Sequence, residues 1–296
     1  MISILTPTYN RAYILHNAYR SLCEQSLFDF EWIIIDDGSI DNTEELVAVW
    51  KKECNLFPII YYKQENGGKH RAVNKGISFV RSEYVLILDS DDILENNAVE
   101  LIHKWIISIE GLSGFAGVAG LKGWNNKEGV VGRGVKKDYI DATNLERRKY
   151  GLDGDKAEIY KTEILKKYPF PEFDGENFLR ESASWDRIAY NGYKLRWFNT
   201  VIYRCDYLGD GLTKNAGDEL YAKNFNGFTY CTKLHISTLP FLYKYLKIGY
   251  YIKVAKLKKM KNKEICELLG IKRVQIFLGT IIYKTNTVIK KIVGKK

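Results

Sequence analysis

Short apolar runs alternate with amphipathic stretches along roughly the first 110 residues of the chain. The apolar runs lie at Ile2–Leu5, Phe30–Ile35, Pro58–Tyr62 and Tyr84–Leu88. The stretches with helical periodicity lie at Asn17–Gln25, Thr43–Glu53, Lys69–Val80 and Ala98–Ile109. Strands that are apolar along their whole length are typical of a parallel sheet whose two faces are both covered. The pattern therefore predicts an α/β, Rossmann-like, mostly parallel sheet with helices on both faces.

The pattern changes further along the chain. Residues 111–154 are rich in glycine and irregular, so we expect loops there with one or two strands. A helix is predicted over Glu176–Asn191, a strand over Leu195–Tyr203, and mostly helices from Asp218 onward. These changes predict two domains, at residues 1–215 and 216–296.

The composition is that of a folded chain, and 46% of its 296 residues are hydrophobic. The apolar runs stay below the roughly 18 residues that a membrane-spanning helix needs. Polar residues follow the first apolar run too early for a signal peptide. The five cysteines form no Cys-x-x-Cys pair, so we expect reduced cysteines in a cytoplasmic protein.

Positive charge is concentrated at the C-terminal end of the chain. The net charge is +9, but residues 244–296 hold 15 basic and 2 acidic residues, so the remainder is slightly acidic. Basic residues interleaved with aromatic ones suit a polyanion, either an anionic membrane surface or a nucleic acid. No nucleic-acid module is recognisable, so nucleic acid is not an expected partner. A solvated helical face is the alternative.

The strongest chemical motif is the acidic cluster Asp89-Ser90-Asp91-Asp92 at the end of the fourth predicted strand. Three carboxylates in four residues repel one another unless a cation or a donor network offsets their charge. Carboxylate oxygens suit Mn²⁺ or Mg²⁺, which also bridge phosphate oxygens. A cap for the helix near Ala98 is the alternative, although a cap needs only one Asp.

Two further motifs follow the second and third predicted strands. In the motif Asp36-Asp37-Gly38-Ser39 a carboxylate could accept the imide N–H of uracil or ribose hydroxyls, unless the motif is a plain turn. In the stretch 66–74, two glycines, Lys69, Arg71 and a helix N-terminus favour a diphosphate, with a flexible loop as the alternative. The chain has neither GxGxxG after its first strand nor GxxxxGK[ST], so dinucleotide and P-loop sites lose their main support.

Four segments, in this order and spacing, resemble the N-terminal half of glycosyltransferase family 2, the inverting nucleotide-sugar enzymes of the GT-A fold. They are SILTPTYNR (Ser3–Arg11), IIIDDGS (Ile33–Ser39), NGGKHRAVNKGI (Asn66–Ile77) and YVLILDSDD (Tyr84–Asp92). The resemblance covers roughly the first 110 residues well and the next hundred loosely. It implies a GT-A fold, a nucleotide-sugar donor, and Mn²⁺ or Mg²⁺ as the cofactor.

The resemblance also implies roles for individual residues. Pro7 and Tyr9 match the positions that hold the nucleobase, and Asp37 matches the position that accepts a hydrogen bond from uracil. Arg11 and Arg71 match basic positions near the diphosphate.

Asp89 and Asp91 match the outer residues of the family's DxD motif. Asp91 is expected to contact the metal and Asp89 the ribose or the sugar, while Asp92 could share the metal. The other expected contacts to the nucleotide-sugar are Thr6, Asn66, Lys69, Asn74 and Ser90.

An inverting transfer needs a carboxylate that takes the proton from the acceptor hydroxyl. In the family this acid usually belongs to a Glu-Asp pair that opens a helix downstream of the DxD motif, and that pair is absent here. Counted back from Arg187, which resembles the family's helical arginine, Glu181 falls where the second acid would sit. We therefore predict Glu181 as the base, with Glu176 and Asp186 as alternatives.

One later loop carries a weaker resemblance. Asp210-Gly211-Leu212-Thr213 resembles a family loop that closes over the diphosphate, and a turn explains the same residues equally well.

The C-terminal region combines lysines with aromatic and aliphatic residues, as basic amphipathic helices on anionic membranes do. Its apolar stretch Gln275–Tyr283 is too short to span a bilayer. Glycan-building enzymes often use lipid-linked acceptors, so we expect peripheral association with the inner face of the cell membrane. The tail could also form the interface of a homo-oligomer.

Motifs and resemblance together predict a metal-dependent inverting glycosyltransferase of the hexosyl- or acetylhexosaminyltransferase type. Its donor is expected to be a nucleoside-diphosphate sugar, with a UDP-sugar favoured. Its acceptor would be a hydroxyl of a glycan or a lipid-linked glycan in surface polysaccharide synthesis. The alternative is a non-catalytic nucleotide- or membrane-binding protein that retains the fold, which the missing Glu-Asp pair supports.

Overall fold

The computed structural model describes residues 1–206, 208–209, 211 and 217–293, and its contacts divide the chain into two compact units. The first unit comprises Met1–Phe170 and Ser184–Asp206. The second comprises Tyr207–Lys296 together with Pro171–Ala183, called here the 171–183 segment. The predicted boundary at residue 215 stays a prediction, because residues 212–216 lie outside the described residues.

A mixed sheet forms the first unit, and within the described residues it has nine strands. The strands are β1 (Ile2–Thr8), β2 (Phe30–Asp36), β3 (Ile59–Lys63), β4 (Tyr84–Ile87), β5 (Ile93–Leu94), β6 (Phe115–Trp124), β7 (Tyr139–Ala142), β8 (Lys156–Lys161) and β9 (Lys194–Cys205). Their order is β3-β2-β1-β4-β8-β6-β9-β5, with β7 paired to β9. Strands β1 to β4 are parallel, whereas β8 is antiparallel to both β4 and β6. The predicted mostly parallel sheet is confirmed, and β8 is an addition that the sequence pattern did not predict.

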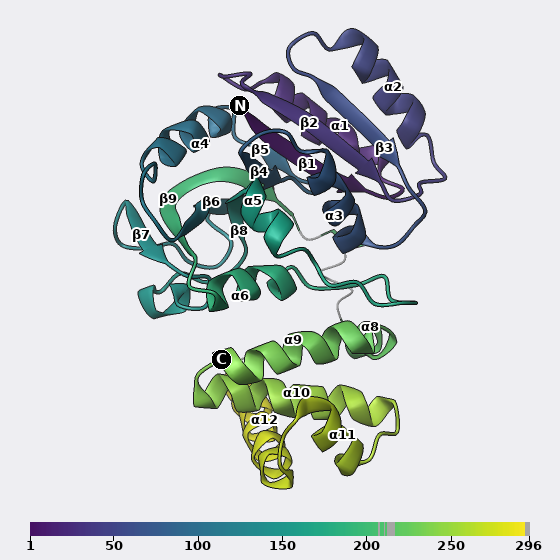
Figure 1. Ribbon diagram of the computed structural model, residues 1–296, viewed down its shortest axis with the longest axis vertical. Coiled ribbons are helices and arrows are strands. Elements are labelled where there is room, and N and C mark those ends of the chain that lie inside the picture. Colours follow the sequence, from purple (N-terminus) through teal and green to yellow (C-terminus); the bar gives the residue numbers. More distant parts are fainter. Residues whose placement is uncertain (207, 210, 212–216, 294–296) are drawn as a thin grey trace. The chain divides into compact units, whose positions relative to one another are not determined.

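Helices cover both faces of the parallel strands (Figure 1). They are α1 (Ala12–Cys23), α2 (Thr43–Glu53), α3 (Lys69–Phe79), α4 (Ala98–Ile107), α5 (Thr162–Lys167) and α6 (Ser182–Tyr190), with a 3-10 turn η1 at Arg147–Tyr150. Tyr19 of α1 and Trp50 of α2 both stack on Trp32 of β2, with ring centroids 6.0 and 5.8 Å away. Gly76 of α3 packs against Leu5 of β1. The helices on both faces are thus as predicted.

The first helix begins at Ala12, earlier than the predicted start at Asn17. Asp41 Oδ2 accepts a hydrogen bond from Ala12 N at 3.0 Å, and Asp41 Oδ1 accepts one from Thr43 N at 3.2 Å. One carboxylate therefore satisfies amides at the start of two helices. The early start could not be read locally, because its capping group lies 29 residues further along the chain.

The second unit is mostly helical, as predicted from Asp218 onward. Its helices are α8 (Asp218–Lys223), α9 (Phe225–Thr238), α10 (Phe241–Leu257), α11 (Asn262–Leu269) and α12 (Arg273–Val293). Tyr221, Ile248 and Tyr251 are among the residues of its buried core. Helices α10 and α12 approach at two glycines, because a Cβ built on Gly249 would lie 2.3 Å from the carbonyl oxygen of Gly279.

The predicted helix over Glu176–Asn191 is wrong in its first part. The helix α6 begins at Ser182, and residues 176–181 are not helical. Asn224 Oδ1 accepts hydrogen bonds from Asn177 N and Phe178 N, both at 2.9 Å, so these amides bind another element. Helical periodicity in the sequence cannot reveal such a competing partner.

The chain leaves and re-enters the first unit at neighbouring points on either side of the 171–183 segment. Asn74 of α3 donates to the carbonyl of Phe170 and accepts from its amide, both at 2.9 Å. Ser184 Oγ donates to the carbonyl oxygen of Tyr168 at 2.6 Å. The two ends of the segment are therefore fixed close together on this unit.

Gly76→Ala is expected to lower the free energy of unfolding by about 1–3 kcal/mol, since overpacking a tight contact is destabilising. A Cβ at this position would lie 2.2 Å from Leu5 Cδ1. Urea unfolding measures the change, with Ser78→Ala on the exposed side of the same helix as the control. Equal stability of Gly76→Ala and wild type would contradict this packing of α3.

Candidate functional site

The loops that follow three parallel strands lie at one edge of the sheet. Strand β1 lies between β2 and β4, and all three run in the same direction. Their carboxyl ends therefore bring together Tyr9 and Arg11, the pair Asp36 and Asp37, and the acidic cluster Asp89–Asp92. Open α/β sheets bind ligands beyond such strand ends.

Two hydrogen bonds lock the loop after β1 to the loop after β2. Asn10 N donates to Ser39 Oγ at 2.8 Å, and Ile40 N donates to Asn10 Oδ1 at 2.9 Å. Asn10 has a φ of 52°, a left-handed conformation that asparagine tolerates. Tyr9, beside this lock, keeps 46% of its surface exposed. An exposed aromatic ring beside a well-ordered loop suits the predicted contact with a nucleobase.

Other residues predicted near the nucleotide lie deeper. Pro7 and Thr6 belong to β1 and are buried, and Thr6 Oγ1 accepts a hydrogen bond from Trp32 Nε1 at 2.9 Å. Arg11 is half-buried, with its guanidinium 5.8 Å from the ring centroid of Tyr13. The Thr6 hydroxyl therefore binds within the core, whereas Arg11 lies at the strand-end edge.

The carboxylate of Asp37 fastens the glycine loop that precedes α3. It accepts hydrogen bonds from the backbone amides of Gly67 at 2.9 Å and Gly68 at 2.7 Å. It also accepts from Gln64 Nε2 at 2.8 Å and from Asn66 Nδ2 at 3.2 Å. Four such bonds match the roughly four lone-pair sites of a carboxylate. Asp37 and Asn66 thus shape the loop in this structure, and the contacts of Asp37 with uracil and of Asn66 with the nucleotide-sugar stay predictions.

The helix α3 carries three of the predicted donor-binding residues. Lys69 Nζ lies 2.5 Å from Asp89 Oδ1, which links the start of the helix to the acidic cluster. The Arg71 side chain packs over Gly67, where a Cβ would lie 2.6 Å from Arg71 Cδ. Asn74 instead holds the backbone of Phe170, as described above. Lys69 and Arg71 thus lie at the loop, while the amide of Asn74 serves the fold.

Two residues outside the sequence motifs hold the acidic cluster. The hydroxyl of Tyr203 on β9 accepts from Asp89 N at 2.9 Å and donates to Asp92. Lys122 on β6 places Nζ 3.9 Å from Asp92 Oδ2 and 3.9 Å from the ring centroid of Tyr203. Sequence analysis missed both, because only the order of the strands brings β6 and β9 near β4. Ser90 is buried within the cluster.

Positive charge from neighbouring residues does not compensate the three carboxylates of the cluster equally. Burial acts to raise the pKa of Asp89, but the ammonium groups of Lys69 and Lys122 outweigh it and lower that pKa. Burial and the neighbouring charge of Asp89 raise the pKa of Asp91. Burial raises the pKa of Asp92 to about 8, although Lys122 opposes the shift. The pKa values of Asp91 and Asp92 thus both stay raised, although Arg11 and Lys69 act to lower the first and Lys122 the second, so added positive charge would stabilise the charged form of either carboxylate.

These residues fit a divalent cation held jointly with phosphate oxygens. Among the described residues, no group of three or more His, Cys, Asp and Glu side chains is arranged to hold a metal alone. Magnesium is commonly bound by one or two carboxylates plus substrate phosphates. The raised pKa of Asp91 indicates a place where added positive charge would be favourable. Asp91, with Asp92 beside it, is thus the part of the cluster suited to Mn²⁺ or Mg²⁺.

The three candidate bases have different surroundings. Glu176 is 8% exposed and accepts from the backbone amides of Asn226 at 2.6 Å and Gly227 at 2.8 Å. Asp186 is 6% exposed and accepts from Asn144 Nδ2 at 2.7 Å.

Glu181 is half-buried and directly precedes α6. Its side chain is more exposed than the nearly enclosed Glu176 and Asp186. Its role as the base stays a prediction. Of the later loop, Asp210, Leu212 and Thr213 lie outside the described residues.

Comparison with known proteins identifies the family. The model of the family described as "Glycosyl transferase family 2" matches residues 3–167 of the chain. GlyG, a glycosyltransferase of Streptococcus pneumoniae serotype 4, is 35% identical over 107 residues, which cover 36% of this chain and 35% of that protein. The chain thus matches about a third of the length of this relative.

Two further proteins match over most of the chain. The GalNAc(5)-diNAcBac-PP-undecaprenol beta-1,3-glucosyltransferase of Campylobacter jejuni is 26% identical over 293 residues, covering 92% of this chain and 89% of that protein. The crystal structure of Staphylococcus aureus TarS 1-349 in complex with UDP-GlcNAc superposes with a TM-score of 0.62 at 18% identity, covering 97% of this chain and 91% of that one. The shared architecture confirms the predicted GT-A fold. The match to more than half of its length shows that the chain belongs to glycosyl transferase family 2.

Proposed function

We propose that the protein is a metal-dependent inverting glycosyltransferase that moves a sugar from a UDP-sugar to a hydroxyl of a glycan or lipid-linked acceptor. The observation that carries the proposal is Asp91, a carboxylate with a raised pKa at the strand-end edge. It forms no ion pair with another described residue, whereas Asp89 and Asp92 are held by Lys69 and Lys122. This arrangement leaves one carboxylate for a cation that accompanies a diphosphate.

The names of two related proteins support the substrate classes. TarS was crystallised with UDP-GlcNAc, and the Campylobacter relative is named for a sugar transfer onto an undecaprenol-linked glycan. The exposed Tyr9 ring supports a nucleobase contact, and Lys69 and Arg71 supply positive charge beside the glycine loop. We therefore infer a hexosyl- or acetylhexosaminyltransferase of surface polysaccharide synthesis.

In the proposed mechanism, this chain orients the donor and moves one proton. Asp91, with Asp92 beside it, would hold Mn²⁺ or Mg²⁺, which supplies positive charge to the departing diphosphate. Lys69 holds Asp89 in place, and Asp37 holds the glycine loop. Glu181 takes the proton from the acceptor hydroxyl as that oxygen attacks the anomeric carbon. The hydroxyl oxygen gains the bond to the sugar, and the diphosphate leaves with its electron pair.

The C-terminal helices support a second part of the proposal, peripheral association with an anionic membrane surface. Helix α12 exposes Val274, Phe277, Ile281 and Val288, which helical spacing places along one stripe. Among the described residues, no helix combines the length and apolar content that crossing a bilayer requires. An exposed apolar stripe on a strongly basic segment is typical of helices that lie in the membrane interface.

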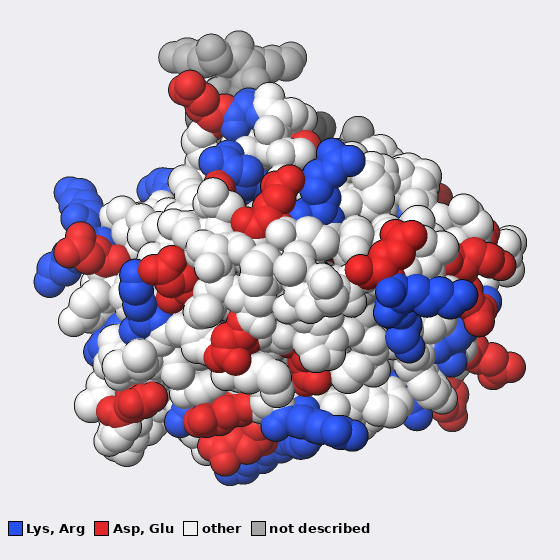
Figure 2. Space-filling view, turned by 90° about the horizontal axis from the view of Figure 1, so that it is seen from above, with Lys and Arg blue, Asp and Glu red and all other residues white. Residues whose placement is uncertain are grey.

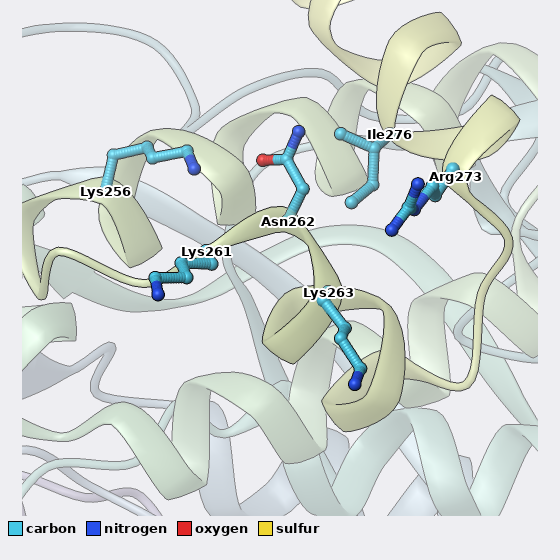
Figure 3. A pocket seen from close by; sticks show the side chains of 6 residues that line it. All are labelled: Lys256, Lys261, Asn262, Lys263, Arg273 and Ile276. Carbon is cyan, nitrogen blue, oxygen red and sulfur yellow. The ribbon is translucent and has the colours of Figure 1, made fainter.

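A basic hollow lies beside this stripe. It is lined by Lys256, Lys261, Asn262, Lys263, Arg273 and Ile276, which come from α10, the start of α11 and the start of α12 (Figure 3). Four of these six side chains are cationic and none is acidic. On the face that Figure 2 shows, by contrast, acidic and basic side chains are interspersed. The hollow therefore offers the charge that anionic lipid headgroups require.

Asp91→Asn is expected to weaken binding of UDP with Mn²⁺ about tenfold or more, because the neutral amide no longer attracts the cation. Isothermal calorimetry measures the affinity, and donor turnover is expected to fall in parallel. Glu100→Gln, an exposed carboxylate paired with Lys104 on α4, is the control and should change neither quantity. Unchanged affinity and turnover in Asp91→Asn would remove the central support of the proposal.

Glu181→Gln is expected to lower turnover by about 10²–10⁴-fold while UDP affinity stays the same, since the amide cannot accept the proton. Turnover is followed as UDP release with a panel of UDP-sugars and lipid-linked acceptors. Asp186→Asn is the matched comparison, and it should mainly lower stability through its bond to Asn144. Binding of UDP by wild type without turnover on any donor would instead favour the non-catalytic alternative.

Flotation with phosphatidylglycerol vesicles tests the membrane contact. The variant Lys261→Glu/Lys263→Glu/Arg273→Glu should lose vesicle binding about tenfold or more, given about 1 kcal/mol for each basic residue near an anionic surface. The control variant reverses the charge of three lysines, Lys51, Lys52 and Lys104, which are exposed on helices of the first unit. Equal flotation of both variants and wild type, or equal binding to uncharged vesicles, would contradict the proposal.

A further inference from the structure

Glu176 anchors the 171–183 segment to the first turn of α9. Its carboxylate is 8% exposed, and it accepts from Asn226 N at 2.6 Å and from Gly227 N at 2.8 Å. Amides in the first turn of a helix have no partner within the helix, and a negative charge there is favourable. The sequence shows no sign of this bond, since 50 residues separate Glu176 from Asn226.

Asn224 completes the attachment from the opposite side. This residue directly precedes α9 and is 3% exposed. Its Oδ1 accepts from Asn177 N and Phe178 N, both at 2.9 Å, and its Nδ2 donates to the carbonyl oxygen of Leu220 at 2.9 Å. The segment thus caps the helix while the residue before the helix caps the segment, and we call the two together the Glu176–Asn224 clamp.

Close packing accompanies the clamp. A Cβ built on Gly227 would lie 2.9 Å from Leu179 Cδ1 and 3.3 Å from Glu176 Oε2, so a larger residue here would require these two side chains to shift. The guanidinium of Arg180 lies 5.7 Å from the ring centroid of Tyr221 on α8. The backbone of Asn177 and Phe178 and the side chains of residues 176, 179 and 180 therefore hold this stretch against α8 and α9, although it has no regular secondary structure.

We propose that the Glu176–Asn224 clamp sets the position of Glu181, so that Glu176 and Asn224 are positioning residues for the transfer. The inference rests on the proposed role of Glu181 as the base. Glu181 follows Arg180 directly and is the last residue before α6, so its backbone is the continuation of the clamped stretch. A base that is displaced by about 1 Å can cost about a hundredfold in rate. The helical unit would then contribute to the chemistry through the segment that it holds.

The test compares Glu176→Gln with wild type at a temperature well below the melting point of each variant. The Gln side chain keeps the size of Glu, but it lacks the charge and cannot offer two acceptor oxygens to the two amides. We expect turnover to fall about 10- to 100-fold, with UDP and Mn²⁺ affinity unchanged. Asn224→Ala should do the same, while Asn224→Asp keeps an acceptor for Asn177 and Phe178 and should recover part of the turnover.

Asp218→Asn is the matched control within the same unit. Asp218 pairs with Lys253 at 2.5 Å and links α8 to α10 without bonding to the 171–183 segment. This variant should lower stability without lowering turnover of the folded enzyme. An equal loss of turnover in Asp218→Asn and Glu176→Gln would assign the effect to general loosening of the helices and overturn the inference.

A double variant separates this inference from the proposed function. If Glu176 acts through Glu181, then adding Glu176→Gln to Glu181→Gln should lower turnover no further. A full multiplicative loss in the double variant, or normal turnover in Glu176→Gln beside an inactive Glu181→Gln, would overturn the positioning role alone. Normal turnover in Glu181→Gln itself would overturn the proposed base, and the positioning role with it.

Discussion

The first unit depends on positive charge at the end of β4, where three carboxylates follow one another within four residues. Mutual repulsion would open this turn if nothing offset it. Lys69 reaches Asp89 from α3, and Lys122 reaches Asp92 from β6. Elements on both sides of the strand are therefore tied to the same turn. Of these three carboxylates, Asp91 is the one without an ion pair among the described residues, and it is the carboxylate that we propose for the cation.

The proposed chemistry is divided between two parts of the chain. The strand ends of the first unit carry the residues that suit a nucleotide and its diphosphate. The candidate base belongs to the 171–183 segment, whose contacts are with α8 and α9. The C-terminal helices would therefore serve two purposes, since they hold the segment and expose the basic hollow. This division explains why motifs in the first third of the chain predict donor-binding residues but do not predict the base.

The parts that could be predicted are those in which local pattern and tertiary environment agree. Strands β1 to β4 are nearly all apolar because both faces of the sheet are covered. The sequence pattern therefore predicted these strands and the acidic residues at their ends. Strand β8 was missed because three of the six residues in its sequence, Lys-Ala-Glu-Ile-Tyr-Lys, are charged. Helix α6 begins later than the predicted start at Glu176. The amide that follows Glu176 donates to Asn224, and the Glu176 carboxylate accepts from an amide of α9. Lys122 and Tyr203 carry no local signal, since they meet the acidic cluster only through the strand order.

The anchoring of Phe170 by Asn74 and of Ser184 by Tyr168 has an evolutionary consequence. An excursion that starts and finishes at one place on a rigid scaffold can change length and composition without shifting the strands of that scaffold. Insertions or deletions between residue 171 and the clamped residues would therefore leave the sheet and the start of α6 where they are. The fold could then diversify in this short stretch while its strands keep their order and register.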